Sequence, residues 1–210
     1  MKPPESFVRS TVRPLAPYGP PRDPAAVPLH LNESPSDLPQ ELKAELSERI
    51  ARSDWSKYPI VDGARLAEDL ARAFQVDPAG VLVGNGSNEL LQLTLLACVE
   101  PGDAVVVAAP SFSLYALQAA ALGARVIEVP LRSADGAFRF PTDELIRAAR
   151  ESSAKLVMLG SPNNPTGTAL TAEGAERIAQ EAPGLTGIDE AYRDFCQQDF
   201  APLLARAPRL

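Results

Sequence analysis

The sequence predicts an α/β fold, with a mostly parallel sheet covered by helices on both faces. Short runs of apolar residues alternate along the chain with stretches in which apolar residues recur every three or four positions. Strands and helices that alternate in this way form βαβ units, whose parallel strands are buried on both sides. Turn-forming residues follow several of the apolar runs, which is where ligands bind in such sheets.

Most of these elements are set by simple apolar patterns. Leucine or isoleucine recurs every four residues from Leu38 to Ile50, and Leu66, Leu70 and Phe74 repeat the pattern, so both segments are predicted to be amphipathic helices. Further helices are expected over residues 87–98, 113–122, 143–150 and 171–181. Strands are expected over residues 81–83, 104–109, 125–129, 155–159 and 185–188.

The first thirty residues differ from the rest. Residues 1–30 contain 8 of the 21 prolines, and proline fixes φ and removes a backbone donor. We therefore expect an extended N-terminal arm over 1–30 and the α/β domain over 31–210.

Composition narrows the class of protein. With 45% hydrophobic and 22% charged residues, 210 residues can bury a sizeable core. A net charge of −7 argues against nucleic acid or an anionic membrane as a main partner. Two cysteines, no apolar leader and no run of 18 apolar residues predict a soluble cytoplasmic protein. With a single histidine, His30, neither a metal site nor a Ser-His-Asp triad is supported.

Four turn segments are expected to meet at one rim of the sheet, because Gly84, Pro110, Ser161 and Asp189 each fall at the carboxyl end of a predicted strand. The first leads from Gly84 into Ser87 and Asn88. Glycines followed by a helix start suit a phosphate group, although an ordinary helix cap uses the same residue types.

The other three segments carry aromatic, amide and acidic groups. Phe112 and Tyr115 follow a buried strand, where a ring can stack on a flat ligand or simply pack in the core, and both interpretations of Tyr115 stay open. The string from Asn163 to Gly167 precedes Asp189 by one strand and one helix. A lone Asp at a strand end is more often a cap or a turn, but its spacing from this string favours a functional role.

Together these motifs resemble the fold-type I aminotransferases, which use pyridoxal phosphate (PLP), and among them the histidinol-phosphate aminotransferases. The similarity covers nearly the whole chain from about Val12 and rests on the following strings: Leu29-His30-Leu31-Asn32-Glu33-Ser34-Pro35, Lys57-Tyr58-Pro59, Gly84-Asn85-Gly86-Ser87-Asn88-Glu89-Leu90, Pro110-Ser111-Phe112-Ser113-Leu114-Tyr115, Ser161-Pro162-Asn163-Asn164-Pro165-Thr166-Gly167 and Asp189-Glu190-Ala191-Tyr192-Arg193-Asp194-Phe195. Asn88 and Ser34 depart from the family pattern, which bears on the substrate and not on the fold.

The resemblance implies a role for each residue. Ser87 and Asn88 would bind the cofactor phosphate, and Phe112 would stack on its ring. Asn164 and Tyr192 would bind the ring hydroxyl oxygen, and Asp189 would face the pyridine nitrogen and keep it protonated.

Three more residues complete the implied site. Tyr58 would reach the cofactor phosphate of the partner subunit in a homodimer, although a surface tyrosine before a turn explains it equally well. Tyr18 and Asn32, in and beside the arm, would contact the substrate. No metal is implied.

By the same resemblance the protein would transfer an amino group from glutamate to imidazole-acetol phosphate, giving histidinol phosphate. A threonine-phosphate decarboxylase-like activity or another class I or II aminotransferase is the nearest alternative. The second alternative is a non-catalytic chain that binds a phosphate-bearing ligand or a partner subunit.

The C-terminal part of the family pattern is missing. None of Lys2, Lys43, Lys57 and Lys155 lies in the family's context for the lysine that forms the Schiff base with the cofactor. We therefore expect a partial PLP-binding large domain without the small C-terminal domain, inactive alone, with an open sheet edge and an exposed apolar face.

Overall fold

The computed structural model describes residues 4–19, 29, 31–58 and 63–210. Its centre is a parallel sheet of four strands in the order β2-β1-β5-β6. The strands are β1 (Ala104–Ala109), β2 (Arg125–Pro130), β5 (Leu156–Gly160) and β6 (Leu185–Asp189). Each agrees with a predicted strand to within one residue at either end. The parallel α/β architecture is therefore confirmed.

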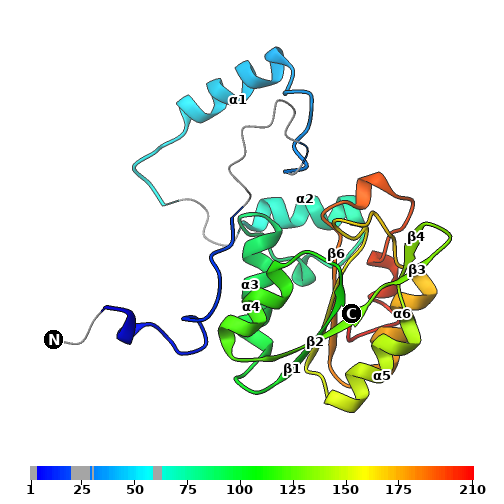
Figure 1. The fold of residues 1–210 in the computed structure, drawn as a ribbon. Coiled ribbons are helices and arrows are strands. Elements are labelled where there is room, and N and C mark those ends of the chain that lie inside the picture. The colour runs from blue at the N-terminus through cyan, green and yellow to red at the C-terminus, as the bar shows by residue number, and fades with distance from the viewer. Residues whose placement is uncertain (1–3, 20–28, 30, 59–62) are drawn as a thin grey trace.

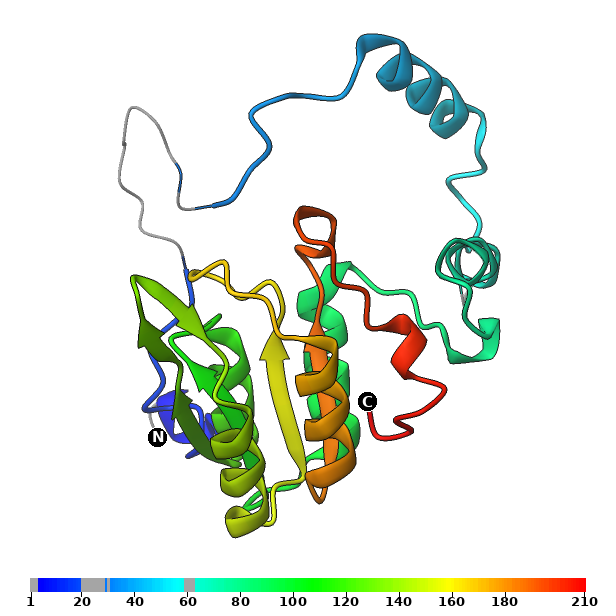
Figure 2. The same cartoon turned by 90° about the vertical axis from the view of Figure 1, so that its right-hand side faces the viewer.

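Side chains of the central strand β1 point alternately into two separate cores. Val106 and Ala108 pack in a cluster with residues of α5 (Thr142–Ser152) and α6 (Ala172–Glu181). Val105 and Val107 pack in a second cluster with residues of α3 (Gly86–Cys98) and α4 (Leu114–Leu122). Figures 1 and 2 show the two helix pairs on opposite faces of the sheet. A strand buried on both faces needs an unbroken apolar run, which Ala104–Ala109 provides.

The remaining helices lie toward the two ends of the chain. They are α1 (Gln40–Arg52), α2 (Ala64–Phe74) and the 3-10 helices η1 (Pro4–Phe7), η2 (Pro78–Gly80), η3 (Arg193–Phe195) and η4 (Ala201–Leu203). After η4 the chain returns to the edge of the sheet, where the Thr186 amide donates to the Arg209 carbonyl at 2.7 Å. The outer edge of β6 is therefore partly covered rather than fully open.

One expected strand is absent, and one pair of strands was not expected. Residues 81–83 are not a strand, and Leu82 is 67% exposed. An apolar run becomes a strand only where a neighbour supplies backbone partners, and none of the described strands pairs with it. Conversely, β3 (Arg132–Ala134) and β4 (Ala137–Arg139) form an antiparallel hairpin that was not expected. Its turn is Asp135-Gly136, both with positive φ, which is a typical hairpin sequence.

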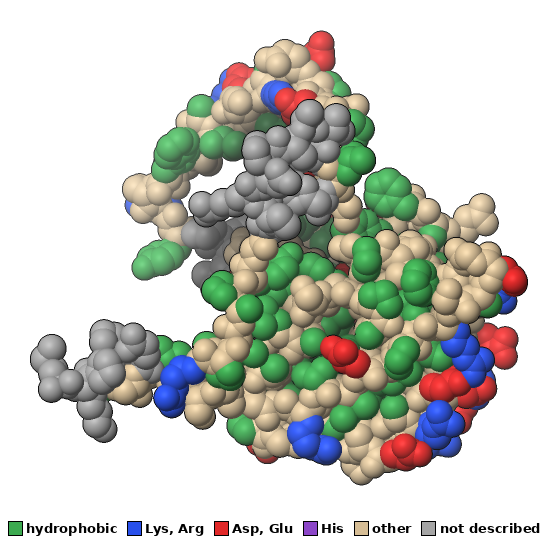
Figure 3. All heavy atoms as spheres, viewed as in Figure 1, with side chains coloured by type: hydrophobic (Ala, Val, Ile, Leu, Met, Phe, Trp, Pro, Cys, Tyr) green, Lys and Arg blue, Asp and Glu red, His purple; other side chains and the backbone are tan. Residues whose placement is uncertain are grey.

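The predicted amphipathic helix α1 lies apart from the sheet in both ribbon views (Figures 1 and 2). It has no buried residue; Leu42, Leu46 and Ile50 of its apolar stripe are exposed, and so is Leu38, which precedes the helix. Elsewhere on the face seen in Figure 3, apolar side chains gather over α2, α3 and α4, and charged ones over α5 and α6. Exposed apolar surface is thus present on this side of the molecule, while the apolar face expected where the family pattern stops stays a prediction.

The described part of the arm is not extended throughout. It contains η1 and a hydrogen-bonded turn in which the amides of Val12 and Arg13 donate to the carbonyl of Arg9. The Thr11 hydroxyl donates to the Ala121 carbonyl at 2.8 Å, which fixes this part of the arm on α4. Much of the rest, residues 20–28 and 30, lies outside the described residues. No helix in the described part of the chain combines the length and apolar character needed to cross a membrane.

Candidate functional site

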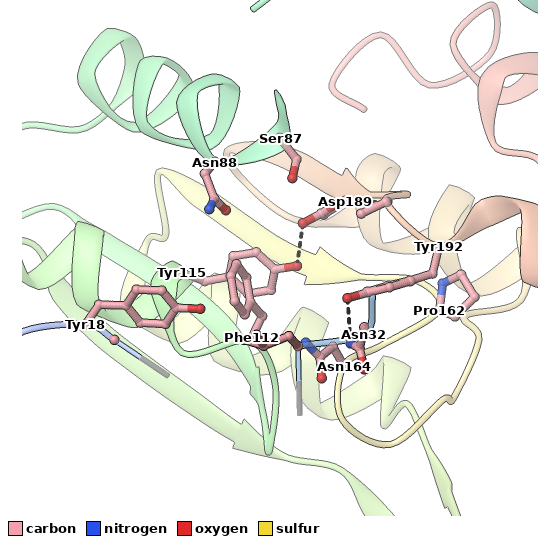
Figure 4. Close-up of a pocket in the computed structure, with 13 residues that line it drawn as sticks. Tyr18, Asn32, Ser87, Asn88, Phe112, Tyr115, Pro162, Asn164, Asp189 and Tyr192 are labelled. Atoms are coloured by element: carbon pink, nitrogen blue, oxygen red, sulfur yellow. Dashed lines mark hydrogen bonds between the residues drawn. The ribbon is translucent and has the colours of Figure 1, made fainter. Parts of the chain in front are cut away.

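A pocket of about 450 Å³ lies at the carboxyl ends of β1, β5 and β6. The loops that follow these strands meet there with the start of α3 and with the arm, as Figure 4 shows. The strand-end rule therefore located the pocket correctly. The lining residues are Tyr18, Gly19, Leu31, Asn32, Ser87, Asn88, Phe112, Tyr115, Pro162, Asn164, Asp189, Ala191 and Tyr192.

Asp189 is the last residue of β6 and the one charged residue among those lining the pocket. Its Oδ1 accepts a hydrogen bond from the Ala191 amide at 2.9 Å, and its Oδ2 accepts one from the Tyr115 hydroxyl at 2.9 Å. The backbone is held as well, because the Ser161 amide donates to the Asp189 carbonyl at 2.9 Å. The carboxylate is thus fixed at the pocket wall and can accept a further hydrogen bond from a cationic group.

Of the two roles that the sequence left open for Tyr115, the structure shows core packing, and it adds a hydroxyl contact that was not expected. Its side chain is buried in the core beneath α3 and α4, while its hydroxyl reaches Asp189 at the pocket. Burial, and then the nearby Asp189 carboxylate, raise the pKa of the Tyr115 hydroxyl above its ordinary value. The hydroxyl therefore stays protonated and can act as the donor in this hydrogen bond.

Three aromatic rings form one side of the pocket. The ring of Phe112 meets that of Tyr115 edge to face, with centroids 5.6 Å apart, and that of Tyr18 edge to face at 6.1 Å. Edge-to-face contacts with two neighbours hold the Phe112 ring in one orientation at the pocket (Figure 4). A flat ligand can stack there, so the role predicted for Phe112 fits its position.

The loop after β5 is held by a buried side chain. Asn163 donates from Nδ2 to the Pro110 carbonyl at 3.0 Å and to the Thr166 hydroxyl at 2.8 Å. Its Oδ1 accepts from the Ser111 hydroxyl at 2.5 Å. Asn163 is thus a structural anchor, while its neighbour Asn164 lines the pocket. Of the two consecutive asparagines, Asn163 therefore stabilises the loop and Asn164 faces the ligand pocket.

The start of α3 places Ser87 and Asn88 at the pocket. The first N–H groups of a helix have no partner within the helix and are suited to an anion. Gly84 also has a packing role, beside the expected approach of an anion to this turn, which stays a prediction. A Cβ there would lie 2.8 Å from Glu89 Oε2 and 2.9 Å from Leu90 Cδ2, so the glycine lets the first turn of α3 pack closely.

Residues near the N-terminus close another side of the pocket. Asn32 donates from Nδ2 to the Tyr192 hydroxyl oxygen at 2.8 Å, across 160 positions of sequence. Tyr18 lies against Phe112. Both predicted substrate contacts, Tyr18 and Asn32, therefore lie at the same pocket as the predicted cofactor contacts.

Some expected residues lie elsewhere. Tyr58 is 96% exposed and does not line the pocket, and its predicted role across a dimer interface stays a prediction. His30 and Pro59 lie outside the described residues. The sequence analysis missed Gly19, Leu31, Pro162 and Ala191 as lining residues. Pro162 and Ala191 belong to the strings that begin at Ser161 and Asp189. Their place in these motifs could have identified them as pocket residues.

Burial also raises the pKa of the carboxyl group of Glu190, next to Asp189. Its Oε1 has no hydrogen-bond partner in the described structure. Glu190 does not line the pocket with Asp189. Within the described ranges, no group of three or more His, Cys, Asp or Glu side chains is placed to hold a metal ion.

Comparison with known proteins decides the family. The model of the family "Aminotransferase class I and II" matches residues 25–209 of this chain. The chain belongs to this family. Its aminotransferase relatives include a histidinol-phosphate aminotransferase of Chlorobium phaeovibrioides, 42% identical over 187 residues, which cover 89% of this chain and 51% of the relative. The chain spans about half the length of the curated relatives it matches.

Solved aminotransferase structures confirm the fold. The histidinol-phosphate aminotransferase of Sinorhizobium meliloti, in complex with pyridoxal-5'-phosphate, superimposes with a TM-score of 0.65 at 31% identity, covering 74% of this chain and 42% of that one. The N-succinyldiaminopimelate aminotransferase of Mycobacterium tuberculosis gives a TM-score of 0.66 at 30% identity, covering 75% and 44%. This chain is therefore similar to the part of an aminotransferase that contains the parallel sheet.

Proposed function

We propose that this chain forms the N-terminal part of the PLP site of an aminotransferase, and that the whole protein transfers an amino group from glutamate to imidazole-acetol phosphate, giving histidinol phosphate. The observation that carries the proposal is one pocket that brings Asp189, Asn164, Phe112 and the start of α3 together. The family match and the names of the most similar relatives support it. The volume of the pocket, about 450 Å³, is in the range of small-molecule and cofactor pockets.

The donor set of the pocket fits PLP. The helix start with Ser87 and Asn88 offers N–H and side-chain donors for a phosphate group. Asn164 and Tyr192 offer donors for the ring hydroxyl oxygen, and the Asp189 carboxylate offers an acceptor for the protonated ring nitrogen. Phe112 supplies an apolar face for the ring.

Each residue then has a definite task. PLP, when bound, supplies an electron sink for the bond that breaks at the amino-bearing carbon. Asp189 keeps a proton on the ring nitrogen, because an opposite charge at close range favours the cation. Asn164 and Tyr192 hold the ring hydroxyl oxygen, and Phe112 keeps water from one face of the ring.

The substrates and the assembly are part of the same proposal. Glutamate is the amino donor and imidazole-acetol phosphate the acceptor, with Tyr18 and Asn32 placed to contact them. Tyr58, exposed on this chain, reaches the phosphate site of a partner subunit in a homodimer. We place the enzyme in the cytoplasm.

A second candidate function is suggested by the positions of the described lysine and arginine side chains relative to the pocket. No Lys or Arg is among the residues that line the pocket, and Lys43, Lys57 and Lys155 lie elsewhere. The second candidate is that residues 1–210 bind PLP, or another phosphate-bearing ligand, without a covalent bond to any of the described lysines.

Titration of residues 1–210 with PLP, followed by equilibrium dialysis, tests the proposal. We expect saturable binding at one site, without the red-shifted absorbance of PLP covalently held by a lysine. Asp189→Asn removes a charge-assisted hydrogen bond of about 1.5–3 kcal/mol, so Kd rises about tenfold or more. Asp135→Asn, in the exposed hairpin turn, is the matched control and leaves Kd unchanged. Equal binding by Asp189→Asn and the wild type would contradict the proposal.

A further inference from the structure

Tyr115 lines the pocket, but most of its side chain is buried in the core. Only 4% of its surface is exposed, and it packs in the core with Leu91, Leu95 and Met158. Its hydroxyl is the one polar group on this otherwise apolar side chain, and it points to Asp189 (Figure 4). Burying a hydroxyl is costly unless it is hydrogen-bonded, so this contact is needed by the core as well as by the site.

The hydroxyl decides how the Asp189 carboxylate is oriented. A carboxylate at the end of a strand can turn about its own side-chain bonds, and the Ala191 amide holds only Oδ1. The Tyr115 hydroxyl holds Oδ2 at 2.9 Å. Two donors on two different oxygens leave one orientation, in which the remaining lone pairs are available to the pocket.

The space for this hydroxyl is created by a glycine at the end of β5. A Cβ on Gly160 would lie 2.8 Å from the Tyr115 hydroxyl oxygen, closer than such atoms pack. The next nearest atoms, Asn163 Oδ1 and Tyr115 Cε2, would be at 3.7 Å, which is ordinary contact. The glycine is therefore required by the hydroxyl alone, and the two residues form a matched pair.

We propose that Tyr115 is a positioning residue whose hydroxyl, seated over Gly160, holds the Asp189 carboxylate toward the protonated nitrogen of an aromatic ring in the pocket. The ring-nitrogen part rests on the proposed function, since Asp189 is assigned there to the cofactor ring. The positioning part rests on the contacts alone. Tyr115 itself does not touch the reacting atoms.

The first test needs no ligand. Tyr115→Phe, Asp189→Asn and the double variant are unfolded by denaturant, and their unfolding equilibrium constants are compared. If the hydroxyl holds the carboxylate, the effects of the two substitutions on the unfolding equilibrium constant are non-additive by about fivefold, because residues in direct contact couple. Additivity within twofold would overturn the positioning part. Thr94→Val, which removes a hydroxyl bonded to the Leu90 carbonyl, is the control and adds independently to Asp189→Asn.

The second test compares PLP with an analogue in which a C–H replaces the ring nitrogen. The wild type prefers PLP, and Tyr115→Phe lowers this preference about tenfold while affinity for the analogue stays within twofold. If Tyr115→Phe keeps the full preference, the inference is overturned while the proposed function stands. If the wild type has no preference, the proposed role of Asp189 is overturned, and with it the ring-nitrogen part of the inference.

Discussion

The side-chain amide of Asn163 donates to the carbonyl oxygen of Pro110 at 3.0 Å and so ties the loop after β5 to the loop after β1. These two loops carry Asn164 and Phe112 to the pocket. The structure therefore positions two candidate contact residues through a third that is buried and does not line the pocket.

Asn163→Ala should destabilise the protein and loosen the site. The substitution removes the buried Asn163 amide from three part-buried hydrogen bonds, with the Pro110 carbonyl, the Ser111 hydroxyl and the Thr166 hydroxyl, so the free energy of unfolding falls by about 2–3 kcal/mol. Denaturant unfolding measures it. Gln197→Ala, at an exposed position, is the control and changes stability by less than about 0.5 kcal/mol. A loss as small as the control's would show that Asn163 does not hold the two loops together.

Gly160→Ala should be tolerated only when Tyr115 has lost its hydroxyl. In the wild type the new methyl group meets the hydroxyl oxygen at 2.8 Å, and overpacking of this kind costs about 1–3 kcal/mol. In Tyr115→Phe the space is free, so the same substitution costs less than half as much. Thermal or denaturant unfolding of the four proteins decides it. Equal costs in both backgrounds would mean that the hydroxyl does not occupy this space.

Stability at high pH should depend on Tyr115. Burial, and then Asp189, raise the pKa of its hydroxyl in the folded state, with Tyr192 adding to the effect. Because the unfolded chain releases the proton near pH 10 and the folded chain keeps it, stability is lost as the pH rises above about 10. The slope approaches about 1.4 kcal/mol per pH unit for this group.

The difference between wild type and Tyr115→Phe isolates this term from the other titrating groups. Their unfolding free energies should run parallel with pH from neutral to about pH 9 and converge or cross above about pH 10. Parallel curves up to pH 11 would contradict the pKa shift assigned to Tyr115.

Two glycines should respond differently to alanine. Gly84→Ala brings a Cβ within 2.8 Å of Glu89 Oε2 and 2.9 Å of Leu90 Cδ2, two flexible side chains of the first turn of α3 that must move, so we expect a loss of up to about 1 kcal/mol and weaker PLP binding. Gly80 has open space and no positive φ, so Gly80→Ala keeps or slightly raises stability, by less than about 1 kcal/mol. Similar effects of both substitutions on PLP affinity would argue against a role of the α3 start in binding.

Local patterns predicted most of the fold and many of the pocket residues. The two central strands, β1 and β5, are apolar runs, and Asp189, Asn164 and Phe112 lie in or beside turn motifs at the strand ends. The strand predicted over residues 81–83 was wrong, because a strand needs a neighbouring strand as a hydrogen-bond partner and the local sequence does not show whether one is present. The β3–β4 hairpin was not predicted, although the dipeptide Asp135-Gly136 is typical of a two-residue hairpin turn.

Contacts between distant positions were beyond the sequence. Tyr115 and Asp189 are 74 positions apart, and Asn32 and Tyr192 are 160 apart, so no spacing rule links them. The same holds for Gly160. The sequence does not show why a glycine is needed there, because the reason is the nearby Tyr115 hydroxyl, which a side chain would meet. Motifs identify the groups that face a ligand, whereas the groups that orient them emerge from packing.

A crystal structure of residues 1–210 grown with PLP tests the central claim most directly. The account predicts the phosphate at the start of α3 beside Ser87 and Asn88, the ring against Phe112, and the ring nitrogen within hydrogen-bond distance of the Asp189 carboxylate. A cofactor bound elsewhere, or one in this pocket with its ring nitrogen turned away from Asp189, would contradict it.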